Sequence, residues 1–197
     1  SLHNKEFLGI IGPNGSGKST FLKCVYRVQK PTSGDIYFDG QHLDELSYRE
    51  SALKLAVVAQ HNFYSFDFSV LDVVLMGRSP HKKMLERDNL EDFKIARSAL
   101  ARVGMASFEK RMFSTLSGGE QQRVAIARAI AHKPKIIFAD EPTAELDSNT
   151  GLQVMKIFKE LIEKQGVTIV MTTHDTGLME IADCIYHIED GEIADED

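Results

Sequence analysis

The residues best suited to chemistry in this chain lie in one glycine-rich segment near its start. It reads Gly12-Pro13-Asn14-Gly15-Ser16-Gly17-Lys18-Ser19-Thr20 and follows the apolar run Phe7–Ile11. The spacing G-x-x-x-x-G-K-[ST] is typical of a phosphate-binding loop, whose backbone N–H groups and following helix start face the phosphates. In that arrangement Lys18 contacts the β- and γ-phosphates, and the Ser19 hydroxyl binds Mg²⁺. The predicted phosphate-contacting residues are Gly12, Asn14, Gly15, Ser16, Gly17, Lys18, Ser19 and Thr20.

An accidental match by a glycine-rich turn is the alternative. Because glycine is near 7% of residues, the four fixed positions should recur by chance in roughly one chain of this size in a hundred. The apolar run before the loop and the helix-forming Phe21–Val25 after it supply the context that a phosphate-binding loop requires. We therefore favour the phosphate-binding loop.

A second glycine-rich helix start, Leu116-Ser117-Gly118-Gly119-Glu120, precedes a helix expected to run to about Ala131. Exposed N–H groups and the helix dipole favour an anion there, and we predict that Ser117, Gly118 and Gly119 contact the nucleotide. Plain helix capping is the alternative, because Ser117 and Glu120 have the spacing of a capping box. Two successive glycines are poor helix formers, and this favours a functional role.

Two adjacent carboxylates, Asp140 and Glu141, follow the apolar run Ile136–Ala139. Side chains alternate along a strand, so the two are expected to point differently and to take different roles. We predict that Asp140 holds Mg²⁺ through its water shell and that Glu141 polarises the attacking water as general base. A solvated acidic turn before Pro142 is the alternative.

The elements that must position these residues are short apolar strands separated by amphipathic helices. The expected strands are Phe7–Ile11, Ile36–Phe38, Leu55–Ala59, Ile136–Ala139 and Val167–Met171. A buried helical face at 154–162 precedes the last strand, which favours an α/β fold with a mainly parallel sheet covered by helices on both faces. We predict a phosphate-loop NTPase core at 1–60 and 116–197, with a helical subdomain inserted at 61–115.

Ligands of open parallel sheets bind beyond the carboxyl ends of the strands. Gly12, Gln60, Asp140 and His174 each follow such an end. We therefore expect these four positions to meet at one edge of the sheet.

Composition limits the class of protein. The chain has 197 residues, 43% hydrophobic and 26% charged, with a net charge of −6, so a nucleic-acid partner is not expected. It has no apolar run near the length of a membrane span and no visible signal peptide. Cys24 and Cys184 are isolated and offer neither a disulfide framework nor a zinc site, in keeping with a reduced cytoplasmic chain. The chain begins at Ser1 and enters the phosphate-binding loop almost at once, so we expect that the N-terminal strand region of the full domain is missing.

These residues together resemble the nucleotide-binding domain of an ABC transporter along essentially the whole chain. The matching motifs are the phosphate-binding loop at Gly12–Thr20, the Q-loop at Gln60, the signature at Leu116–Gln122, the magnesium strand at Ile136–Glu141, the D-loop at Ala144–Asp147 and the switch histidine at His174. The resemblance implies ATP and Mg²⁺ as cofactors, with catalytic roles for Glu141, His174 and Gln60 and metal contacts from Ser19, Gln60 and Asp140. It also implies a head-to-tail homodimer in which each signature completes the partner's ATP site. Further implied partners are a membrane permease and, for an importer, a substrate-binding protein, with the chain on the cytoplasmic face of the membrane.

Two departures from the family pattern stand out. The aromatic residue that stacks on adenine upstream of the first strand is absent, so base recognition is expected to be weak. Glu145 occupies a D-loop position where family members more often have a small or amide residue, which is expected to alter the dimer contact there.

The subfamily has two interpretations. The segment Val70–His81 is similar to importers of iron-siderophores, haem and cobalamin, whereas 140–151 and 185–193 are more similar to lipoprotein-release or macrolide-export ATPases. We favour import of an iron-siderophore, haem or similar solute, because the inserted helices are where such domains meet their membrane partner. Mixed ancestry, a soluble ABC ATPase and a non-hydrolysing nucleotide sensor are competing interpretations, and the intact Glu141 and His174 argue against the sensor.

Overall fold

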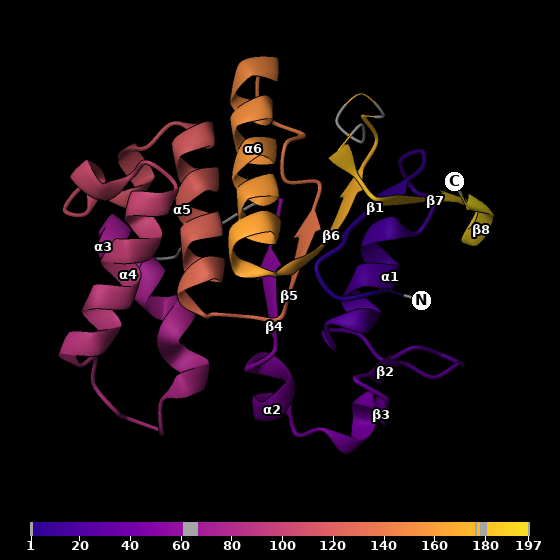
Figure 1. Cartoon of the computed structure of the whole chain (residues 1–197), viewed down its shortest axis with the longest axis horizontal. Coiled ribbons are helices and arrows are strands. Elements are labelled where there is room, and N and C mark those ends of the chain that lie inside the picture. The colour runs from indigo at the N-terminus through magenta and orange to yellow at the C-terminus, as the bar shows by residue number, and fades with distance from the viewer. Residues whose placement is uncertain (1, 61–66, 176, 178–180, 197) are drawn as a thin grey trace.

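A central sheet organises the chain in the computed structural model, which describes residues 2–60, 67–175, 177 and 181–196. The strands are β1 (Phe7–Ile11), β2 (Tyr37–Phe38), β3 (Gln41–His42), β4 (Leu55–Val58), β5 (Ile136–Asp140), β6 (Thr168–Thr173), β7 (Cys184–Glu189) and β8 (Glu192–Glu196). The α-helices are α1 (Lys18–Val25), α2 (Tyr48–Ala52), α3 (Val70–Leu75), α4 (Leu90–Arg102), α5 (Gly118–Ala131) and α6 (Ser148–Gln165). Among the described residues, six strands form one sheet in the order β4-β5-β6-β1-β7-β8 (Figure 1).

The sheet is parallel from β4 to β7, as the sequence predicts, and only the pair β7–β8 is antiparallel. The β7–β8 hairpin turns at Asp190 and Gly191, whose φ values of 48° and 84° suit a two-residue hairpin turn. The predicted strand at 36–38 forms as β2, but it pairs with β3 in a separate two-stranded sheet. That correction follows from the Asp39-Gly40 turn, which folds β2 back on its neighbour in the chain.

Side chains alternate between the two faces of the sheet, and each face is apolar. Helices therefore cover both faces, in two separate apolar cores. On one face, Phe7, Ile137 and Ile169 pack with α3, α5 and α6. On the other face, Leu8 and Val170 pack against Leu22 of α1 and its neighbours. The two-faced burial explains why the central strands are apolar along their whole length.

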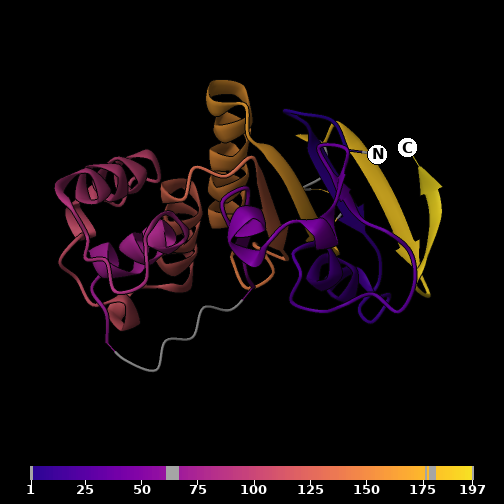
Figure 2. The same cartoon turned by 90° about the horizontal axis from the view of Figure 1, so that it is seen from below.

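The helical part of the chain is tied together by a buried ion pair. Arg78, in the 3₁₀ helix η2 (Met76–His81), donates to Asp92 of α4 (3.1 Å) and to the carbonyl oxygen of Ala131 at the end of α5 (2.7 Å). Burial raises the pKa of Asp92, but its hydrogen bonds from Asn89 and Arg78 and the charge of Lys82 outweigh burial, and the pKa is lowered. Helix α5 lies in the segment 116–197 that was predicted as part of the core. In the structure it packs with α3 and α4 (Figures 1 and 2).

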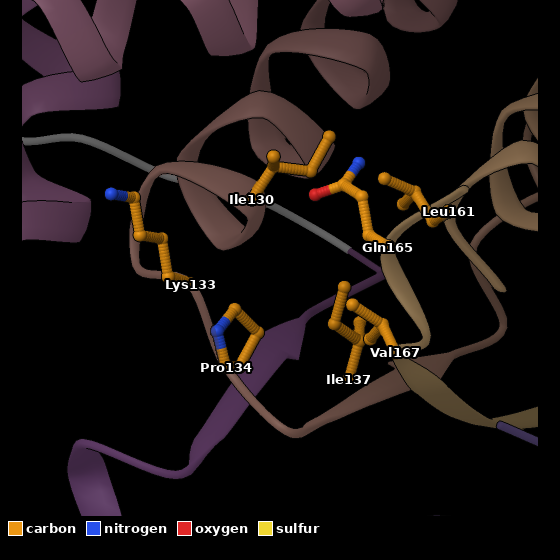
Figure 3. A pocket seen from close by; sticks show the side chains of 7 residues that line it. All are labelled: Ile130, Lys133, Pro134, Ile137, Leu161, Gln165 and Val167. Atoms are coloured by element: carbon orange, nitrogen blue, oxygen red, sulfur yellow. The ribbon is translucent and has the colours of Figure 1, made fainter. Parts of the chain in front are cut away.

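A cavity of about 170 Å³ lies at the amino ends of β5 and β6 (Figure 3). Its lining comes from the ends of α5 and α6 and from the strand starts, and consists of Ile130, Lys133, Pro134, Ile137, Leu161, Gln165 and Val167. This is the edge of the sheet opposite to the one at which the predicted site residues lie. Within the part of the chain that the structure describes, none of the helices combines the length and the apolarity needed to cross a bilayer.

Candidate nucleotide site

The glycine-rich loop joins the end of β1 to the start of α1. Gly15 and Gly17 have φ values of 86° and 103°, in the left-handed region that glycine adopts with little strain. Gly17 is the N-cap of α1 and offers no side chain to bond the first N–H groups of the helix. Those N–H groups have no partner inside a helix, so they are suited to a ligand.

Lys18 is buried at the mouth of this loop. Its ammonium group donates to the carbonyl oxygens of Gly12 (2.8 Å) and Pro13 (3.0 Å) and lies 3.7 Å from Oε1 of Glu141. A single positive charge is thus held between the loop and the end of β5. A phosphate group at this position would meet the charge directly.

The β7–β8 hairpin contacts the loop, and it was not among the predicted elements. The N–H of Gly191 donates to the carbonyl oxygen of Ser16 (3.0 Å). A Cβ atom on Gly12 would lie 2.1 Å from the carbonyl oxygen of Ile188, so only glycine fits there. The buried Ser16 hydroxyl has no hydrogen-bond partner among the described residues. Because a buried hydroxyl is costly without a partner, this atom fits a loop that binds a phosphate oxygen.

Asp140 and Ser19 form the candidate magnesium contact. The Ser19 hydroxyl donates to Oδ1 of Asp140 (2.9 Å), so a hydroxyl and a carboxylate from distant segments lie together. The described residues contain no cluster of three or more His, Cys, Asp or Glu side chains that could hold a metal alone. Mg²⁺ usually binds one or two carboxylates together with substrate phosphates, and this oxygen-only pair beside the loop fits that requirement.

Glu141 lies just beyond β5 in an unusual backbone conformation. Its φ is 45°, and its N–H donates to both the carbonyl oxygen and the hydroxyl of Thr172 (3.1 Å each). Asp140 and Glu141 make different contacts, as predicted, but alternation along a strand is not the reason, because β5 ends at Asp140. The left-handed conformation of Glu141 redirects its side chain, and Oε2 comes within 3.1 Å of Nδ1 of His174.

The predicted meeting of four strand ends is confirmed. Gly12, Gln60, Asp140 and His174 lie at or just after the ends of β1, β4, β5 and β6, four adjacent strands of the sheet. His174 is half exposed and contacts Glu141, whereas Gln60 is exposed two residues after β4. The structure therefore joins the loop, Asp140, Glu141 and His174 by direct contacts and brings Gln60 to the same edge.

The second glycine-rich segment forms a capping box at the start of α5. The Ser117 hydroxyl accepts from the N–H of Glu120 (3.4 Å), and the Glu120 carboxylate accepts from the N–H of Ser117 (2.8 Å). The backbone and side-chain hydrogen bonds from Ser117 lower the pKa of Glu120. The helix begins at Gly118, so both glycines lie in its first turn.

One of these glycines has a packing reason that the sequence analysis missed. A Cβ atom on Gly119 would lie 2.4 Å from Cγ2 of Thr150 in the first turn of α6, whereas one on Gly118 would lie 4.0 Å from Cδ2 of Leu146. The presence of two glycines therefore does not by itself distinguish ligand binding from capping. Close contact between α5 and α6 requires the second glycine.

The phosphate-binding loop and the glycine-rich start of α5 lie far apart within the chain. Figures 1 and 2 both show α5 on one side of α6 and α1 on the other, with the central strands between them. The start of α5 is therefore separated from the phosphate-binding loop of its own chain by α6 and the central strands.

Comparison with known proteins identifies the family of the chain. The family model described as ABC transporter matches residues 1–144. The uncharacterized ABC transporter ATP-binding protein MJ1508 of Methanocaldococcus jannaschii is 41% identical over 190 residues, covering 96% of this chain and 84% of that protein. Petrobactin import ATP-binding protein FpuC of Bacillus anthracis is 39% identical over 170 residues. The match covers 86% of this chain but only 62% of FpuC.

A solved structure shows the same fold. The ATP-binding cassette MJ0796, in a dimeric post-hydrolysis state bound to ADP and Pi, is similar to this chain with a TM-score of 0.85 and 36% identity. The match covers 100% of this chain and 87% of the solved one.

Proposed function

This chain belongs to the ABC transporter family as an ATP-binding subunit that hydrolyses ATP, and we propose that it powers solute import through a membrane permease. The observation that supports the active site most directly is the position of Glu141 between Lys18 and His174, beside the Ser19–Asp140 pair. These residues come from three segments that are distant in the sequence, 18–19, 140–141 and 174. Their convergence at the end of the sheet suits a bound triphosphate.

The proposed hydrolytic step assigns each contact a role. Lys18 and the loop N–H groups would hold the phosphates, and Ser19 and Asp140 would hold Mg²⁺, which would supply charge neutralisation for the transferred phosphate. Glu141 accepts a proton from the water that attacks the γ-phosphate, and His174 orients the Glu141 carboxylate through their hydrogen bond. Gln60 is proposed to contact Mg²⁺ and water from the neighbouring strand end.

The proposed active unit is a head-to-tail dimer. Separation of α5 from the loop within one chain supports the assignment of Ser117, Gly118 and Gly119 to the partner's triphosphate. The dimeric state of MJ0796 supports a dimer as the active unit. Two chains would then form two identical composite sites.

The proposed direction of transport is import. The similarity of Val70–His81 to importers of iron-siderophores, haem and cobalamin supports this, as does the likeness to a petrobactin import protein. The solute is proposed to be a metal chelate of this kind. A substrate-binding protein is the further partner expected for such an importer. Affinity capture of the chain from detergent-solubilised membranes should recover a polytopic permease. In vesicles that contain the permease and this chain, uptake of a labelled chelate should require ATP on the membrane side where this chain is bound.

Glu141→Gln tests the hydrolytic assignment. It preserves shape but removes the base, so turnover should fall at least ~10²-fold, the scale of a lost general base. ATP binding, measured by equilibrium titration with Mg²⁺, should persist. Glu160→Gln, which changes an exposed carboxylate on α6, is the matched control and should leave turnover unchanged. Near-normal hydrolysis by the Glu141 variant would overturn the assignment.

A further inference from the structure

A buried threonine in β6 occupies a position where apolar residues are expected. Thr172 is 0% exposed, and the strand residues before it are the apolar Ile169, Val170 and Met171. Central parallel strands that are buried on both faces are usually apolar throughout. A buried hydroxyl is unfavourable unless it is hydrogen-bonded, so its partners show what it does.

The Thr172 hydroxyl bonds to both carboxylate residues of the site. It donates to Oδ1 of Asp140 (2.8 Å) and accepts from the N–H of Glu141 (3.1 Å). The register of the sheet makes this possible, because Thr172 pairs directly with Asp140 across β5 and β6. A hydroxyl has one hydrogen to donate, and here that hydrogen is used on Asp140.

These bonds fix two groups that hydrolysis needs, the Asp140 carboxylate and the backbone of Glu141. The Asp140 oxygen that accepts from Thr172 also accepts from Ser19, so the carboxylate is fixed by donors from two segments. Glu141 has a φ of 45°, a conformation that persists in a residue with a side chain only when its surroundings hold it. Both acceptors of the Glu141 N–H belong to Thr172.

We propose that Thr172 is a positioning residue for ATP hydrolysis, which sets the Asp140 carboxylate and the backbone of Glu141 through one hydroxyl. The proposal rests on the proposed function of Glu141 as general base. Thr172 touches neither phosphate nor water in this role, so it should affect the rate of hydrolysis more than the binding of ATP.

The test compares three single variants. Thr172→Val replaces the hydroxyl with a methyl group of similar size, and kcat should fall on the order of tenfold to a hundredfold, because small misplacements of catalytic groups have effects of this size. The KM for ATP should change less than about threefold, since the loop and Lys18 are intact. Thr172→Ser keeps the hydroxyl and should recover most of the activity. Thr168→Val removes another buried hydroxyl from the same strand, which accepts from the N–H of Lys5, and should leave kcat unchanged.

A double-mutant cycle with Glu141→Gln separates positioning from a loss of folded protein. If Thr172 acts through Glu141, Thr172→Val should lower the residual turnover of the Glu141→Gln variant much less than that of the wild type. Equal factors in both backgrounds, equal losses in Thr172→Ser and Thr172→Val, or a normal kcat in Thr172→Val would each overturn the proposal. Stoichiometric ATP binding by each variant reports the folded fraction. Normal turnover in Glu141→Gln alone would instead refute the proposed function.

Discussion

Helices α1 and α5 both follow glycine-rich segments, yet their first turns are built differently. Gly17 caps α1 in a left-handed conformation and provides no side-chain bond, and the first helical residue, Lys18, folds back onto the loop. Ser117 caps α5 with a complete capping box. The first start is therefore open to a ligand, whereas the second is largely satisfied within the chain.

This difference shows that capping and anion binding are compatible. A capping box bonds the third N–H of a helix and leaves the earlier ones without a partner inside the helix. In α5 those earlier groups belong to Gly118 and Gly119, next to an exposed Ser117. Capping and ligand binding are therefore not exclusive alternatives, because α5 is suited to present N–H groups of a capped first turn to a ligand held by another chain.

The largest expected effect tests whether the phosphate-binding loop and the start of α5 that serve one ATP site come from one chain or from two. Lys18→Ala and Ser117→Arg should each abolish hydrolysis, the first by removing the phosphate-binding charge and the second by filling the start of α5. When the two variants are mixed, mixed dimers contain one composite site free of both changes. Turnover should then recover to about a quarter of the wild-type value if pairing is random and sites are independent.

A control chain carrying both changes distinguishes this arrangement from simple dilution. Mixed with wild type, the double variant should also form dimers, but each such dimer has one change in each of its two sites, so it adds no activity. Absence of recovery in the Lys18→Ala and Ser117→Arg mixture, under conditions in which ATP forms dimers, would mean that the loop and the α5 start that serve one ATP site belong to the same chain.

The next effect concerns the packing of α5 rather than its ligand. Gly119→Ala should destabilise the fold by about 1–3 kcal/mol, the usual range for overpacking, because its Cβ would meet Thr150 at 2.4 Å. Thr150 cannot easily move, since its hydroxyl donates to Asp147 (2.6 Å). Gly118→Ala has room and should be neutral or stabilising by up to ~1 kcal/mol through helix propensity. Urea unfolding measures both.

A second-site change isolates the contact. Thr150→Ser removes the methyl group that would clash but keeps the hydroxyl for Asp147, so it should restore most of the stability of Gly119→Ala. If Gly118→Ala and Gly119→Ala were equally destabilising, the cause would be helix propensity at the first turn instead of contact with α6.

Much of this architecture could be predicted from the sequence because its signals are local. The spacing of the loop glycines, the apolar strands and the polar residue after each strand place Gly12, Gln60, Asp140 and His174 at one edge. The Asp190-Gly191 pair between β-type runs is also a local hairpin signal, and it could have revealed β7 and β8. That hairpin explains Gly12, whose backbone approaches Ile188.

Other features depend on contacts between distant segments. The φ of Glu141 and the role of Thr172 follow from the pairing of β5 with β6, which no local pattern specifies. Gly119 likewise depends on Thr150 in the next helix. Such positions are set by tertiary contact, and a single sequence offers only the residue type as a hint.

The smallest expected effect is a pH dependence at the capped start of α5. The hydrogen bonds from Ser117 lower the pKa of Glu120 in the folded state, so its charged form stabilises the fold above the ordinary value of 4.5. That contribution should be lost as the pH falls through the lowered pKa.

Glu120→Gln keeps a side chain that can complete a capping box but does not titrate. Wild type should exceed this variant in unfolding free energy by a few tenths of a kcal/mol at pH 7, a value kept small by solvent screening. The difference should shrink as the pH falls below the ordinary value of 4.5 and through the lowered pKa. A difference between wild type and Glu120→Gln that stays constant over this range would mean that the carboxylate charge contributes nothing to the cap.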